Sequence, residues 1–168
     1  MLVLWSKSRV NMSIRPALLV IASLVSFSSH ALNFHDKAPN DELNDIKQSI
    51  EQAQNTLHYE RTVNGTGHVP MPKDNSDKPA RSYFEVVSYD IYTSQSGKRV
   101  IQAIVTNHSG GGIVLKPQQI KAYLSNSTYV EPVRIKQEGR FAQNETKSVT
   151  LYFEDTDASI LGLVLRPY

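Results

Sequence analysis

The sequence predicts a mainly β protein, an antiparallel sandwich of seven short strands that follows one amphipathic helix and a flexible linker. Two observations lead to this prediction. From Tyr83 onward, apolar and polar residues alternate in short runs, and turn-forming residues recur about every 8–12 residues. Before residue 60, apolar residues recur instead at spacings of three and four, as on one face of a helix.

The N-terminal residues have the layout of a secretory signal peptide. A cationic stretch at residues 7–15 precedes an apolar run at 17–27, which ends in the small residues of 29–31. This order predicts a signal peptide over residues 1–31 that is cleaved after Ala31. The apolar run is shorter than the about 20 residues that cross a bilayer. An uncleaved N-terminal anchor and a start at Met12 are the alternatives.

Cleavage changes the charge of the chain. It removes Lys7, Arg9 and Arg15 but no acidic residue, so the net charge falls from +2 to −1. The mature chain then has no electrostatic support for binding nucleic acid or an anionic membrane, and no segment expected to span one. Cysteine is absent. Because small secreted eukaryotic domains usually carry disulfides, this absence favours the bacterial periplasm or cell exterior.

Residues 32–60 are predicted to form an amphipathic helical segment. Leu43, Ile46, Ile50 and Leu57 fall on one face together with an alanine. This apolar stripe is narrow, as it is along the seam of a coiled coil. Two interpretations stay open: the helix packs on its own sheet or is a frayed tether, or its stripe contacts another chain.

Residues 61–82 are rich in proline and glycine and are predicted to be a flexible linker. Residues 83–168 form the predicted β domain. Its seven expected strands are 83–93, 99–106, 113–115, 119–124, 129–136, 146–153 and 160–166. Pro117 indicates a sheet edge or a change of strand, and Pro132 indicates a sheet edge, because proline cannot donate to a ladder. The strand number and spacing are typical of an immunoglobulin-like sandwich.

Four sequence segments within residues 83–166 carry a family resemblance. They are, in order, VIQAIVTNHSGGGIVLKPQQIKAYLSN, YVEP, FAQNETKSVTLYFE and ILGLVL. This order resembles the small immunoglobulin-like domains of exported bacterial proteins of unknown function. Asn107 matches an Asn that ends a strand in that family. Where the family has a glycine turn, this chain has Asn144, which must then supply the positive φ. The resemblance implies an accessory or binding module and carries over no catalytic residue.

The sequence favours a non-enzymatic protein. No cysteine nucleophile exists, and no serine lies in a GxSxG elbow. His35, His58, His68 and His108 lack the carboxylate and nucleophile neighbours that mark a catalytic base. No catalytic residue and no cofactor is therefore expected.

Two short segments offer metal ligands. His68 and Met71 form a soft pair that suits Cu(I). Glu154, Asp155 and Asp157 offer oxygen ligands that suit Ca²⁺. Ordinary linker residues and a solvated acidic turn explain the two segments better, so no metal site is predicted. A periplasmic protein that binds a metal or small ligand is kept as the alternative function.

The predicted function is a binding or assembly module of the bacterial cell envelope that recruits a protein partner. The candidate contact residues are Leu43, Ile46, Ile50, Leu57, Tyr123 and Tyr152. The two tyrosines are included because they lie opposite the apolar alternation of their strands, and tyrosine is enriched at recognition surfaces. The strands bounded by Pro117 and Pro132 are expected to accept or donate a strand at a sheet edge.

Overall fold

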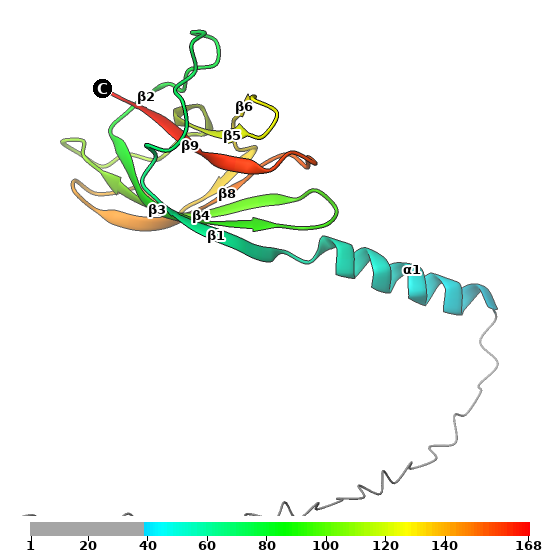
Figure 1. Ribbon diagram of the computed structural model, residues 1–168. Helices are drawn as coiled ribbons and strands as arrows, with labels where there is room; N and C mark the ends of the chain where they lie inside the picture. Colours follow the sequence, from blue (N-terminus) through cyan, green and yellow to red (C-terminus); the bar gives the residue numbers. More distant parts are fainter. Residues whose placement is uncertain (1–38) are drawn as a thin grey trace, which may run out of the picture. The chain divides into compact units, whose positions relative to one another are not determined.

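The computed structural model describes the backbone of residues 39–168 and the side chains from Leu43 onward. This part of the chain is mainly β, with one α-helix and nine strands in two sheets (Figure 1). The predicted class is therefore confirmed, but the predicted count of seven strands is wrong. The predicted signal peptide and His35 lie outside the described residues.

The larger sheet has five strands, and each pairs antiparallel with its neighbours. In sheet order they are β1 (His58–Asn64), β3 (Phe84–Thr93), β4 (Arg99–Asn107), β8 (Thr146–Tyr152) and β7 (Arg134–Lys136). The central strands β4 and β8 match their predicted ranges closely, because both alternate cleanly between apolar and polar residues.

The smaller sheet has four strands. In sheet order they are β2 (Arg81–Ser82), β9 (Ile160–Pro167), β5 (Ile120–Leu124) and β6 (Tyr129–Val130). Strand β2 runs parallel to β9, and the other pairs are antiparallel. Strand β5 thus lies inside the sheet, so the edge position predicted from Pro117 is wrong. That proline instead opens a short 3-10 helix, Pro117–Gln119, ahead of the strand.

The two sheets enclose one hydrophobic core. Inward residues of β3, β4 and β8 meet inward residues of β5 and β9 across it. Ile101, Ala103 and Val105 of β4 are fully buried, as are Ile120 and Ala122 of β5. Because side chains alternate with a period of two, a slip of one residue would turn each set outward, and the core thereby fixes the strand register.

The stretch predicted as one strand at 129–136 passes from one sheet to the other. Strand β6 pairs with β5 in the smaller sheet, and β7 pairs with β8 in the larger one. Pro132 lies between them and has no N–H to contribute to a ladder. Both strands are sheet edges, which confirms the edge position predicted from Pro132. The predicted strand at 113–115 makes only one isolated bridge, from Ile113 to Phe141.

The helix α1 (Pro39–Asn55) ends before the predicted limit at residue 60. Strand β1 follows after two residues, so the last residues of the predicted helical segment and 61–64 of the predicted linker lie in the larger sheet. This helix lacks the length and apolarity needed to cross a membrane, and the described chain has no other candidate.

Residues 65–80 have almost no regular secondary structure, yet they are bonded to the smaller sheet. The Tyr129 hydroxyl donates to the carbonyl oxygen of Pro70 at 2.9 Å. The backbone N–H of Ala80 donates to the carbonyl oxygen of Gln118, in the 3-10 helix ahead of β5, at 2.7 Å. This segment connects the edge strand β1 of one sheet to the edge strand β2 of the other.

Candidate functional site

The helix α1 and Leu57, which follows it by two residues, expose the whole apolar stripe that the sequence predicts. Leu43, Ile46 and Ile50 leave 52–55% of their surface exposed, and Leu57 leaves 41% exposed. No residue of α1 whose side chain is described is buried. Isolated helices of this length are marginal in water, because most helical stability comes from packing an apolar face. The stripe is therefore a surface available to a partner.

Hydrogen bonds hold the C-terminal end of α1 to the turn between β3 and β4. The Ser96 N–H donates to the Gln54 carbonyl oxygen at 3.0 Å, and the Ser96 hydroxyl donates to Asn55 Oδ1 at 2.9 Å. The same turn binds the loop after β8, where the Thr156 N–H donates to the Gly97 carbonyl oxygen at 2.9 Å. The end of the helix, this turn and that loop thus lie at the same end of the two sheets.

One residue from each strand of the larger sheet lies in a row across the outer face of that sheet. In sheet order the row is Tyr59, Tyr92, Val100, Tyr152 and Arg134, and we call it the tyrosine row. The rings of Tyr59 and Tyr92 meet edge to face with centroids 5.9 Å apart. The guanidinium of Arg134 lies 4.0 Å from the Tyr152 ring centroid, a cation–π contact. The predicted contact residue Tyr152 is therefore part of a continuous band.

The other predicted contact tyrosine lies elsewhere. Tyr123 belongs to the outer face of the smaller sheet, where its ring centroid is 4.8 Å from that of Tyr129. Lys121, on the same face, is nearly buried, and its Nζ lies 3.5 Å from Glu131. The structure thus does not bring Tyr123 and Tyr152 together, because they lie on the outer faces of different sheets.

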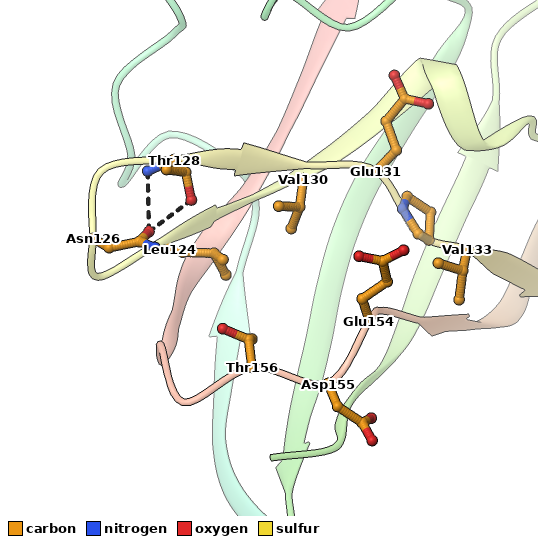
Figure 2. A pocket seen from close by; sticks show the side chains of 10 residues that line it. Leu124, Asn126, Thr128, Val130, Glu131, Val133, Glu154, Asp155 and Thr156 are labelled. Atoms are coloured by element: carbon orange, nitrogen blue, oxygen red, sulfur yellow. Dashed lines mark hydrogen bonds between the residues drawn. The ribbon is translucent and has the colours of Figure 1, made fainter.

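A hollow of about 570 Å³ opens beside the edge strand β6 (Figure 2). Its lining combines apolar side chains with carboxylates, and the residues that define it are Leu124, Val130, Val133, Glu131, Glu154 and Asp155. Figure 2 shows the Glu154 carboxylate directed toward the hollow and the Asp155 carboxylate directed away from it. Within the described chain neither of these two carboxylates forms an ion pair. The edge at Pro132 and the acidic loop that begins at Glu154 are far apart in the sequence, and both line this hollow.

The candidate metal ligands of the sequence are not gathered into a group of three. Across residues 39–168, no three His, Asp or Glu side chains are grouped in a way that would hold an ion. His68 lies in the loop after β1, and its Nε2 is 3.1 Å from the carbonyl oxygen of Asn64, the last residue of that strand. Met71 is exposed.

His108 gains a carboxylate neighbour that its sequence context does not reveal. Its Nε2 lies 2.7 Å from Glu85 Oε2, because the pairing of β3 with β4 brings the two segments together. They border a hollow of about 420 Å³ that Tyr83 and Tyr168 also line, and the rings of these two tyrosines stack with centroids 4.2 Å apart. In the described residues no hydroxyl forms a hydrogen bond with the His108 ring.

Comparisons with protein-family models, curated proteins and solved structures give no match for this chain. Its function is therefore inferred from the surfaces described above.

Proposed function

We propose that the protein is a non-enzymatic binding or assembly module of the bacterial cell envelope, exported by a cleaved signal peptide, that recruits a protein partner through α1. The exposed apolar stripe of α1 is the observation that supports this proposal most. In this proposal the two sheets form an immunoglobulin-like sandwich that serves as the scaffold for the helix.

The chemistry of α1 suits insertion into an apolar groove. Burying apolar surface is worth about 25 cal/mol per Å², so a partner that covers the exposed half of the four stripe side chains gains binding energy from each of them. Anchors spaced by three and four residues are typical of helices that lie in a groove. The helix also carries four acidic residues and one lysine. A matching partner therefore has an apolar groove with a basic rim.

Paired substitutions on the two faces of α1 test this proposal. Ile46→Glu with Ile50→Glu places two charges in the stripe, whereas Gln48→Glu with Gln52→Glu places two charges outside it. After crosslinking in the native cell, the stripe variant should lose its crosslinked partner and the control should keep it. Equal crosslinking by both variants would contradict the proposal. Circular dichroism and an unchanged unfolding midpoint establish that the sandwich is intact in each case.

A second candidate function is the binding of a small ligand or metal, and the hollow in Figure 2 is the observation that favours it. Its apolar side chains and the Glu154 carboxylate, which points into it, suit a ligand with a cationic end. Calorimetry with Ca²⁺, Zn²⁺ and Cu(I), followed by small organic cations, tests this function. Binding heat that Glu154→Gln abolishes would support it, and the absence of heat with every probe would rule it out.

A further inference from the structure

We propose that the partner of α1 is the tyrosine row of a second copy of this chain, so that two copies exchange their helices. This inference rests on the proposed function, because it takes the α1 stripe to be a contact surface, and it names what that surface contacts. Four properties of the described chain lead to it.

The first property is that α1 does not cover its own sheet. Only Thr56 and Leu57 separate α1 from β1. The bonds from Ser96 to Gln54 and Asn55 hold the end of the helix at the β3–β4 turn, and the stripe stays exposed in that arrangement. Turning α1 back onto its own tyrosine row would break these bonds. A second copy can cover the row without breaking them.

The second property is that the stripe is too short for helix-to-helix pairing alone. Leu43, Ile46, Ile50 and Ala53 occupy alternating a and d positions over two heptads. Coiled coils generally show about three to four such heptads or more. A stable contact for α1 therefore needs a surface other than a second narrow stripe, and the tyrosine row offers three aromatic rings and a valine.

The third property is a match in size. The tyrosine row crosses five strands, which at about 4.8 Å per strand spacing makes it about 19 Å long. The 17 residues of α1 make a helix of about 25 Å at 1.5 Å per residue. One helix can therefore cover the row from Tyr59 to Arg134. A two-fold pair contains this contact twice, because each copy supplies one helix and one row.

The fourth property is complementary charge. The row ends at Arg134, and Lys136 follows it on the same exposed face of β7. Neither cation forms an ion pair within the described residues. The acidic helix α1, with four acidic residues against one lysine, is the one helix among these residues that can supply the opposite charge.

The absence of cysteine permits a direct test by disulfide crosslinking of the exported protein. Ile50→Cys marks the middle of the stripe, and Val100→Cys marks the middle of the row. Mixing and oxidising the two single variants should give a covalent dimer with one chain of each kind, identified by mass spectrometry. Gln48→Cys, which lies off the stripe, is the matched control and should crosslink to Val100→Cys at least about tenfold less.

Any of three other results in this experiment would overturn the inference. If Ile50→Cys alone links to itself as efficiently as the mixture links, the helices pair with each other. If a chain with both cysteines closes on itself and stays monomeric, α1 covers its own sheet. If no disulfide forms and light scattering shows a monomer, the copies do not associate.

Light scattering also separates this inference from the proposed function. The dimer should dissociate on Arg134→Glu with Lys136→Glu, and its dissociation constant should rise with salt, because the charges at the end of the row are exposed. A monomer whose stripe still binds an identified envelope protein would overturn the helix exchange and leave the proposed function intact. A dimer that Ile46→Glu with Ile50→Glu does not weaken would also overturn the exchange.

Discussion

The backbone N–H of Asn144 donates a hydrogen bond of 2.8 Å to the carbonyl oxygen of Asn107. The side-chain amide of Asn107 donates to three further carbonyl oxygens at 2.8–3.2 Å, those of Gly111, Phe141 and Ala142. Its Oδ1 accepts from the N–H of Ser109 at 2.8 Å, and the residue is fully buried. Asn107 thus joins the end of β4, the glycine run and the turn before β8.

Replacing Asn107 should be among the most damaging single changes in the sandwich. Asn107→Ala removes one donor from each of three carbonyl oxygens, which keep a second donor, and leaves the Ser109 N–H without its acceptor. A lost hydrogen bond costs about 0.5–1.5 kcal/mol, and an unsatisfied buried group costs about 1–3 kcal/mol. We therefore expect a loss of about 3 kcal/mol or more in the free energy of unfolding, measured by urea denaturation. Asn126→Ala is the matched control, because Asn126 bonds to Thr128 at an exposed turn and should cost less than about 1 kcal/mol. Similar losses for both variants would contradict the role given to Asn107.

The turn at Asn144 has the conformation expected from the sequence, with a φ of 58°. Only glycine adopts this left-handed region without cost, and asparagine tolerates it better than alanine does. Asn144→Gly should therefore leave the unfolding free energy within about 0.5 kcal/mol, and Asn144→Ala should lower it by about 1 kcal/mol. The two denaturation curves measure this difference. If alanine proved as stable as glycine here, backbone strain would not explain the asparagine.

The elements that the sequence predicts well are those in which one face is buried. Strands β4, β5, β8 and β9 alternate or carry a continuous apolar run, and their ranges agree with the structure within about two residues at each end. The sequence does not predict strand β1, because most of its residues are polar and exposed, as is usual for an edge strand. Strand β2 has only two residues and depends on β9 for its existence.

The α1 stripe and the tyrosine row also differ in how well the sequence predicts them. The α1 stripe can be read from local spacing, because it belongs to one helix. The tyrosine row cannot, since it exists only once five strands take their register, and Tyr59 belongs to the strand that the sequence does not reveal. The hollow in Figure 2 likewise joins the Pro132 crossing to the acidic loop, which are more than 20 residues apart in the sequence.

The packing of the loop at residues 65–80 can be tested at Gly162. A Cβ added there would lie 2.7 Å from Val69 Cγ1 and 3.0 Å from the Tyr89 hydroxyl. Gly162→Ala should therefore lower the unfolding free energy by about 1–3 kcal/mol through overpacking. Val69→Ala should relieve part of this loss in the double variant, because the two substitutions share one contact. Purely additive losses would mean that the loop does not pack on β9. Gly67→Ala is the control, since nothing lies within 4 Å of its added Cβ.

The free energy of unfolding should fall at acid pH because of Glu145. Its carboxylate accepts a hydrogen bond from the Ala142 N–H at 2.6 Å and lies 3.0 Å from Lys147 Nζ. First the backbone bond and then the lysine lower the pKa of Glu145 below its ordinary value. A folded pKa below the unfolded one of about 4.3 gives stability that is present above that pH and is lost as pH falls through the folded pKa. The difference in unfolding free energy between the wild type and Glu145→Gln should therefore narrow from about pH 7 to about pH 3, as measured by urea midpoints.

Glu138→Gln is the control, because it removes a charge from the same loop but does not remove the acceptor of the Ala142 N–H. A difference that stays constant over this range would show that the Ala142 and Lys147 contacts do not stabilise the charged form of Glu145.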